Sequence, residues 1–268
     1  MSPGLGRRAF LAGAASALVA ARAPAQTAPA SAGAVDPKLI EDLVAANRIL
    51  ADQGVVDGYG HVSMRHPADP QRYLMSRSIA PEMVAAGDVM EYDLDSSPVD
   101  ARGRTSYLER FIHGEIYRAR PDVTAVVHNH SPSVIPFGVS TASLRPLYHM
   151  SAFLGGGVPV FDIKVAAGQA TDMLVRTPAL GRALAQTLGA RPVALMRGHG
   201  AVVVADSLPR VVFRSVYTEM NARLQAQAMA LGGPVTYLDD EEARRAEASV
   251  AGTIPRPWEL WKKKALAR

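Results

Sequence analysis

The sequence contains no cysteine among its 268 residues. Disulfide bridges and Cys-rich structural zinc sites are therefore excluded, although an oxidising compartment would be tolerated. Any metal site must be built from His, Asp or Glu, and such a set of donors favours an open, reactive site over a closed structural one.

A hydrophobic run long enough to span a membrane is also lacking at the N-terminus, because the apolar stretch over residues 9–21 is too short. It follows Arg7-Arg8 and precedes small residues around Pro24, which is the layout of a twin-arginine export signal. A disordered or amphipathic N-terminus is the alternative. We expect a signal peptide over 1–25, a linker over 26–35 and export to the periplasm.

A strong charge of one sign is lacking as well. The net charge is +4, but residues 1–25 hold three arginines and no acid, so the remainder has a surplus of a single positive charge. The basic residues Lys262, Lys263, Lys264 and Arg268 form a short cluster that is typical of a solvated C-terminal tail. We therefore expect no nucleic-acid partner.

The composition, 48% hydrophobic and 20% charged, is that of a globular chain with an ample core. Hydrophobic periodicity and turn signals predict strands over 58–67, 72–78, 88–100, 121–128, 159–164 and 192–205, and helices starting at Asp36-Pro37 and over 106–118, 171–189 and 209–231. The mixed order predicts an α/β fold, and we expect one catalytic domain over 36–268.

Two histidines end the predicted strand over 121–128. Because side chains at i and i+2 point to the same side of a strand, His128 and His130 can aim at one point. Such a pair is half of a metal site, although histidine pairs also occur in cores and on surfaces. His199, between two glycines, is a candidate third ligand or an incidental residue at a hairpin corner. Three neutral imidazoles with an open position form a common catalytic metal set.

A carboxylate precedes this strand. Glu109 and His113 are four residues apart in a predicted helix and share one face. They could form a surface hydrogen-bonded pair. Alternatively, Glu109 reaches the metal cavity, where a partly desolvated carboxylate beside a cation can transfer protons near neutral pH.

The strings SYLERFIHGEIYRARPDVTAVVHNHSP and LMRGHGAVVVADSL resemble the class II aldolase/adducin family, and the resemblance extends over roughly residues 36–235. It implies a three-layer α/β/α domain with a central, mainly antiparallel sheet, usually in a homotetramer with sites between subunits. It also implies that His128, His130 and His199 bind the metal, and that Glu109 is the catalytic acid/base.

The family's sugar-phosphate aldolases hold phosphate with a Gly-Asn-x-Ser loop, a Thr-Gly pair and a Ser-Ser pair. Here His61 stands in place of the asparagine, Ser78-Ile79 in place of the Thr-Gly pair, and Tyr107-Leu108 in place of the Ser-Ser pair. A backbone phosphate cradle is therefore not expected. We expect His61, Ser63 or Arg77 to hold a substrate carboxylate, for which a guanidinium is well shaped; a surface salt bridge is the alternative for Arg77.

The strings MSRSIAPE, FIHGEIYRARPD, HSPSVIPFGVS and YHMSAFLGGGVPVFDI resemble the family's decarboxylases of hydroxylated aromatic or ring-cleavage carboxylic acids. Tyr148 and His149 lie in the last string and are candidates for the pocket lining, or else core or subunit-contact residues. The resemblance implies a carbon–carbon lyase that releases CO₂ through a metal-bound enolate, with Glu109 as acid/base.

The sequence is also compatible with other functions. An aldolase for an unphosphorylated hydroxy-keto substrate is the second hypothesis, and a non-catalytic adducin-like module or iron-dependent oxygen chemistry are further ones. We expect a divalent metal ion as cofactor, zinc first, with manganese, cobalt or iron(II) also compatible. The expected partners are a small-molecule carboxylic acid and further copies of the chain in a homo-oligomer, without a membrane span.

Overall fold

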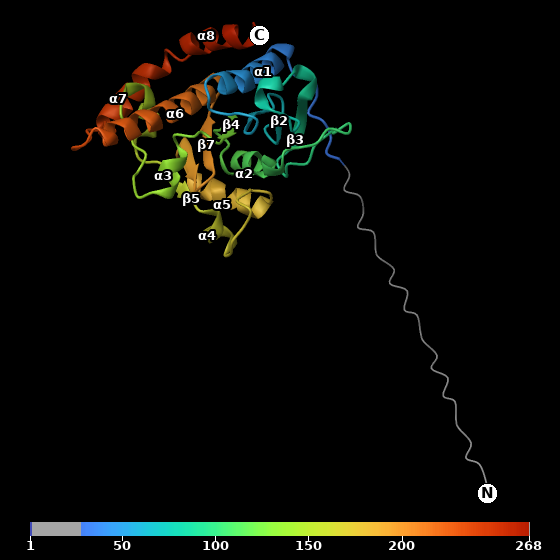
Figure 1. Cartoon of the computed structure of the whole chain (residues 1–268). Helices are drawn as coiled ribbons and strands as arrows, with labels where there is room; N and C mark the ends of the chain where they lie inside the picture. Colours follow the sequence, from blue (N-terminus) through green and yellow to red (C-terminus); the bar gives the residue numbers. More distant parts are fainter. Residues whose placement is uncertain (2–27, 268) are drawn as a thin grey trace.

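The computed structural model describes Met1 and residues 28–267 (Figure 1). The predicted signal peptide lies almost wholly outside the described residues. The strands are β1 (His61–Arg65), β2 (Arg72–Ser76), β3 (Val89–Asp93), β4 (Ala125–Asn129), β5 (Val160–Phe161), β6 (Val193–Met196) and β7 (Gly200–Ala205). The helices are α1 (Pro37–Asp52), α2 (Phe111–Ala119), α3 (Ile135–Val139), α4 (Ile163–Ala167), α5 (Pro178–Leu188), α6 (Leu208–Ala230), α7 (Asp240–Ala251) and α8 (Pro255–Leu266).

The strands form one seven-stranded sheet in the order β3-β2-β1-β4-β7-β6-β5. All neighbours pair antiparallel except β5 and β6, which are parallel. The central strand β4 pairs His128 with His61 of β1 on one side and with Val202 of β7 on the other. The predicted α/β fold with a mainly antiparallel sheet is confirmed.

Helices cover both faces of the sheet, which gives three layers (Figure 1). Successive strand residues face opposite sides, so Val127 packs in the core with α1, α6 and α8, while Val126 packs in the core with α2 and α5. The face of Val126 is also the face of His128, and the catalytic candidates on the sheet therefore lie on the side of α2.

Local sequence signals explain several helix starts. Asp36 caps α1 by accepting a hydrogen bond from the Lys38 amide, and a proline follows it at the first turn. Several expected elements were too long; β3 ends at Asp93 rather than at residue 100, and α2 begins at Phe111 rather than at residue 106. Helix α5 begins at Pro178 rather than at residue 171, and the segment predicted as a strand over 159–164 pairs over two residues before α4 begins. There Asp162 accepts a hydrogen bond from the Lys164 amide, which starts a helix instead.

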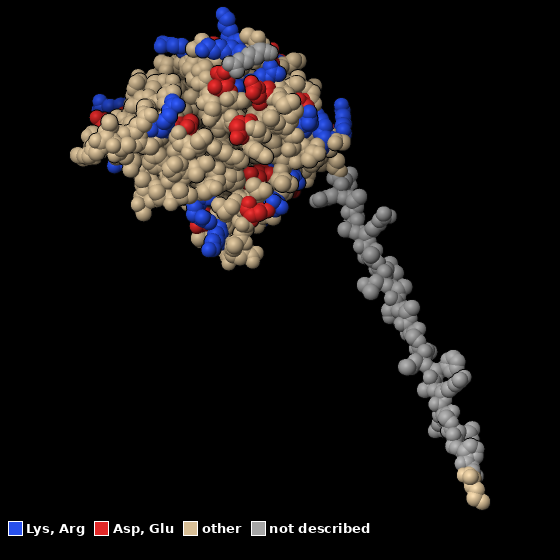
Figure 2. Space-filling view, in the orientation of Figure 1, with Lys and Arg blue, Asp and Glu red and all other residues tan. Residues whose placement is uncertain are grey.

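The C-terminal region is a further difference from the sequence prediction. The basic cluster belongs to helix α8, which packs on α1 and buries Trp258. Lys262 contacts Glu41 at 2.7 Å and Asp42 at 2.6 Å. These lysines therefore lie on a docked helix rather than on a solvated tail. Figure 2 shows side chains of both charge signs interspersed over the visible face.

Among the described residues, no helix is both long enough and apolar enough to cross a membrane.

Candidate active site

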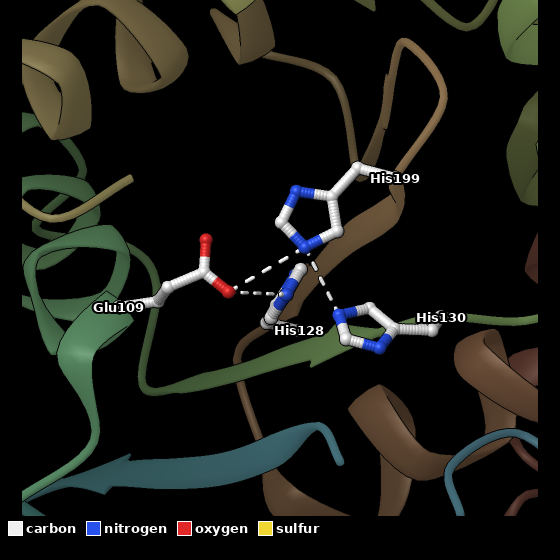
Figure 3. Close-up of side chains that lie close together, drawn as sticks. All are labelled: Glu109, His128, His130 and His199. Atoms are coloured by element: carbon white, nitrogen blue, oxygen red, sulfur yellow. Dashed lines mark hydrogen bonds and ion pairs between the residues drawn. The ribbon is translucent and has the colours of Figure 1, made fainter. Parts of the chain in front are cut away.

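Three histidines from two neighbouring strands converge at one end of the sheet (Figure 3). His128 is in β4, His130 follows the strand, and His199 lies in the turn between β6 and β7. Gly200 permits this close approach, because a Cβ there would lie 2.0 Å from the carbonyl oxygen of Asn129. The expected i, i+2 pair and the expected Gly-His-Gly corner therefore do meet.

Glu109 completes a group of four residues whose ligand atoms all lie within 4.8 Å of one another. Its Oε2 is 3.4 Å from Nε2 of His128 and 3.4 Å from Nε2 of His199. His199 and His130 bring their Nε2 atoms to 3.0 Å. We call Glu109, His128, His130 and His199 the ligand cluster; Figure 3 shows their polar ends directed toward one another.

Glu109 is held in place by the backbone. It lies in the 3₁₀ turn Leu108–Arg110, where the chain kinks before α2, and its side chain is 8% exposed. Its Oε1 accepts a hydrogen bond from the Val175 amide at 2.8 Å, so Oε2 is left for the histidines. Burial alone would raise the pKa of this carboxyl, but His128 and His199 hold it well below its usual range.

The donor set fits a divalent cation. Nε2 of His128 is buried and has no hydrogen-bond partner within the described chain, and its ring is held from behind by a contact of 3.2 Å between Nδ1 and the Ala201 carbonyl oxygen. Burial, and then the neighbouring imidazoles, lower the pKa of His130 to about 4. A neutral imidazole is the form that binds metal, and three of them with a carboxylate are a donor set for zinc and for other divalent metals.

A cavity of about 300 Å³ opens onto this cluster. Its lining includes Glu109, His128 and His130, and the remaining residues are Gly58, Tyr59, Gly60, His61, Ser78, Ile79, Ala80, Tyr107, Leu108 and Leu174. Among the residues that the structure describes, no lysine or arginine is in this lining. Of the positions compared above with the phosphate-binding aldolases, Ile79, Tyr107 and Leu108 bring apolar or aromatic side chains into this lining, whereas Ser78 still offers a hydroxyl.

His61 lines the cavity, but Ser63 does not. The Ser63 side chain is fully buried, and its hydroxyl lies 2.6 Å from Nδ1 of His113 and 2.7 Å from the Tyr117 hydroxyl. His113 in turn places Nε2 2.6 Å from Nδ1 of His61. The structure therefore places Ser63 behind His61, and any effect of Ser63 on a substrate would pass through the His113 and His61 rings.

Arg77 is also outside the cavity lining. Its Nε donates to Oδ1 of Asp88 at 2.6 Å, and the side chain is 37% exposed. Desolvation alone would raise the pKa of Asp88, but the hydrogen bond from Arg77 and that from the Ala85 amide leave it below its usual range. The placement favours the surface salt bridge that the sequence left open for Arg77.

Tyr148 and His149 lie elsewhere in the chain, beside α6 and α7. His149 lines a different cavity of about 260 Å³, together with Arg214 and Glu247. The Tyr148 ring packs on Tyr217, and burial raises its pKa to about 12. Within one chain, neither residue is part of the lining of the cavity beside Glu109, so their contact with a substrate stays a prediction.

Sequence reasoning missed the role of His113 and Tyr117. It considered His113 as a partner of Glu109, whereas the structure pairs His113 with His61 and Ser63. A signal was present: His113 and Tyr117 are four apart on a helix, and His61 and Ser63 are two apart on a strand. Each pair shares a face, but only the packing of α2 on β1 brings the two faces together.

Comparison with protein families decides the affiliation. The model of the Class II Aldolase and Adducin N-terminal domain matches residues 41–226. The chain belongs to this family. Its fold is also that of L-fuculose 1-phosphate aldolase from Glaciozyma antarctica, at a TM-score of 0.70 and 21% identity over 85% of this chain and 88% of that chain.

Proteins similar to this chain include decarboxylases. Decarboxylase tropJ of Talaromyces stipitatus is 36% identical over 244 residues, which are 83% of this chain and 92% of the relative. The 3,4-dihydroxyphthalate decarboxylase of Arthrobacter keyseri is 31% identical over 217 residues, 75% of this chain and 83% of the relative. The expectation of an enzyme is confirmed: the chain is a lyase of the class II aldolase family.

Proposed function

We propose that the protein is a divalent-metal-dependent decarboxylase of a hydroxylated aromatic or ring-cleavage carboxylic acid. The observation that carries the proposal is the convergence of Glu109 and three histidines beside a cavity in whose described lining there is no lysine or arginine. The two decarboxylase relatives support the reaction class, and one of them acts, by its name, on a dihydroxylated aromatic acid.

His128, His130 and His199 would hold the cation, for which zinc is our first expectation. Bound there, it would supply Lewis-acid stabilisation of the negative charge that the scission of the carbon–carbon bond produces, a contribution of several kcal/mol. The histidines contribute fixed positions: His128 is locked by the Ala201 carbonyl group, and His199 by the tight turn at Gly200.

Glu109 would move the proton. Because its pKa is held low, the resting side chain is a carboxylate and must first accept a proton before it can donate one. In the proposed sequence, Oε2 takes the proton of the substrate hydroxyl, the bond to the carboxyl group breaks with release of CO₂, and the electron pair stays on the substrate. Glu109 then returns the proton to the carbon, and solvent restores the hydroxyl proton, so one proton is consumed overall.

The cavity walls would select the substrate. Tyr59, Tyr107 and Leu108 offer flat or apolar surfaces to a ring, and the Tyr107 hydroxyl is already engaged by the Ile79 carbonyl oxygen at 2.5 Å. A phosphate would lose its hydration without meeting a cationic side chain in this lining, which is costly. The same walls suit an aromatic acid whose oxygens face the ligand cluster.

The test combines metal analysis with product detection. The purified protein is analysed for bound divalent metal, then mixed with a panel of ortho-hydroxylated aromatic carboxylates while CO₂, aldehyde and oxygen are followed. Release of CO₂ that stops after chelation and returns with metal supports the proposal. Aldehyde release without CO₂ would instead indicate an aldolase, oxygen uptake would indicate oxygenase chemistry, and protein without metal and without turnover would indicate a binding module.

We also propose export by a twin-arginine signal over residues 1–25 and assembly into a homo-oligomer, a tetramer by family resemblance. Fractionation of cells that express the full chain should recover it, shortened at the N-terminus, in the periplasm. Sedimentation of the purified protein should give a mass near four times that of the shortened chain, which is below the 28.5 kDa of the full chain. Cytoplasmic retention at full length would contradict the first proposal, and a monomer would contradict the second.

A further inference from the structure

A chain of buried hydrogen bonds leads from the helix α2 to the wall of the cavity. Tyr117 contacts Ser63 at 2.7 Å, Ser63 contacts His113 at 2.6 Å, and His113 contacts His61 at 2.6 Å. All four side chains are at most 3% exposed. We call them the relay. Its last member, His61, lines the cavity. The centroid of the His61 ring is 5.1 Å from the centroid of the His128 ring.

The direction of this chain can be derived from its closed end. Among the described residues, Ser63 Oγ is the atom within hydrogen-bond distance of the Tyr117 hydroxyl, so it is the acceptor available to the Tyr117 proton. If Tyr117 did not donate to Ser63, a buried O–H would be left without a hydrogen bond, which is unfavourable. Tyr117 therefore donates and Ser63 accepts.

Each later link follows from the one before it. Ser63 has one proton, so it donates that proton to Nδ1 of His113. His113 is neutral, since burial lowers its pKa to about 3, and with Nδ1 as acceptor its proton is on Nε2. Nε2 donates to Nδ1 of His61. His61 is then left with its own proton on Nε2, the nitrogen that has no partner within the described chain.

We propose that His61 donates this Nε2 proton in a hydrogen bond to a substrate oxygen beside the bond that breaks, and that His113, Ser63 and Tyr117 are positioning residues which fix its tautomer. The inference deepens the proposed decarboxylase function and rests on it. Its physical basis is preorganisation: a donor that is already oriented need not reorient while negative charge develops on the substrate. The opposite tautomer would direct a lone pair at that oxygen and repel it.

The chain offers variants that separate the links. His61→Leu removes the donor, His113→Phe keeps a ring but removes the bond that fixes the tautomer, and His113→Gln keeps an N–H that can reach His61. Tyr92→Phe is the matched control. It removes a hydroxyl from another fully buried tyrosine, which bonds to Ser106 and lies outside the relay.

The first readout is the tautomer itself. Nitrogen NMR of the protein labelled at histidine, assigned by loss of one signal in His61→Leu, should show neutral His61 with its proton on Nε2. In His113→Phe the same signal should shift to a mixture of both tautomers, and in His113→Gln it should return. A wild-type His61 that is protonated on Nδ1, or charged at pH 7, would overturn the proposal.

The second readout is a double-mutant cycle on CO₂ release. We expect His61→Leu and His113→Phe each to lower kcat by about tenfold or more, with KM changed less than about threefold, because the donor acts on charge that develops in the transition state. The double variant should be no slower than His61→Leu alone, since His113 acts through His61. Additive losses would overturn the relay, as would full activity in His113→Phe.

Control outcomes keep the two proposals separate. Tyr92→Phe should keep its turnover, and Ser63→Ala interrupts the relay at another link if His113→Phe fails to fold. The NMR readout uses protein without substrate, so it remains decisive even if no acid of the panel is decarboxylated. If CO₂ is released but the losses are additive, the relay is wrong and the decarboxylase proposal stands.

Discussion

Two groups of histidines lie side by side in this protein, and they differ in how their nitrogens are satisfied. In the ligand cluster, Nε2 of His128 is buried without a hydrogen-bond partner in the described chain, and two other Nε2 atoms face each other at 3.0 Å. In the relay, both nitrogens of His113 meet a partner at 2.6 Å. His130 and His199 are only partly buried, whereas every member of the relay is buried, and the pairing of the nitrogens differs in the same sense.

The difference shows how a metal site can be distinguished from a structural network. A buried polar atom without a partner is costly, so Nε2 of His128, buried among other ligand atoms without a hydrogen bond, favours a ligand at this place. A network in which each donor meets an acceptor needs no ligand, and its hydrogen bonds fix the tautomers of its members. The first arrangement can hold a cation, and the second can orient a neighbouring side chain.

The sharpest test of the comparison is to remove one member of the ligand cluster. His128→Ala should lose the bound divalent metal and lower CO₂ release more than about 100-fold, because removing a ligand opens the site that polarises the substrate. Metal content per protein chain and turnover are the measurements. His66→Asn, a change at a buried histidine outside both groups, is the control. Retention of the metal in His128→Ala would contradict the assignment of the ligand cluster as the metal site.

Glu109→Gln tests the carboxylate of the same cluster. The amide oxygen can still accept from the Val175 amide, so the side chain should keep its place and the three imidazoles should still bind metal. Loss of the base should lower kcat by about 100-fold or more. Metal analysis beside turnover separates a loss of proton transfer from a loss of cation. Full turnover in a metal-loaded Glu109→Gln protein would remove the proposed role.

Acidification should destabilise the folded protein through His113 of the relay. The pKa of His113 is about 3 when folded, because of burial, and about 6.5 when unfolded, so the unfolded chain binds a proton first and stability falls as the pH drops below 6.5. Through this residue, lowering the pH from 7 to 5 should reduce the free energy of unfolding by about 2 kcal/mol. The measurement is urea unfolding at both pH values of wild type and His113→Phe, each treated with a chelator to remove metal. Equal pH slopes in the two proteins would contradict it.

Arg77, outside both groups, should have the smallest effect. In Arg77→Gln we expect KM for the carboxylic acid to change less than about threefold and the free energy of unfolding to fall by about 1 kcal/mol or less, as for other partly exposed ion pairs. Steady-state kinetics and urea unfolding are the measurements. A rise in KM of about tenfold or more would show that Arg77 leaves Asp88 to hold the substrate.

Much of the fold was predictable because the relevant signals are local. The Asp36-Pro37 cap, the apolar strand that ends in His128 and the Gly-His-Gly corner at His199 are patterns within a few residues. The prediction was poorest where a local pattern was overridden. The basic cluster around Lys262 indicated a solvated tail, but burial of Trp258 against the core holds that segment as α8.

The sequence by itself determined the chemical inventory: no thiolate, three histidines and a glutamate in a spacing typical of one family, and bulk where that family's phosphate-binding aldolases have glycine and hydroxyls. Only the tertiary structure decided which of these groups meet. It separated Arg77 and Ser63 from the cavity and joined His61 to His113 and Tyr117. The physical reason is that a face of a strand or helix is set by local periodicity, whereas the partner of that face is set by packing between elements distant in the sequence.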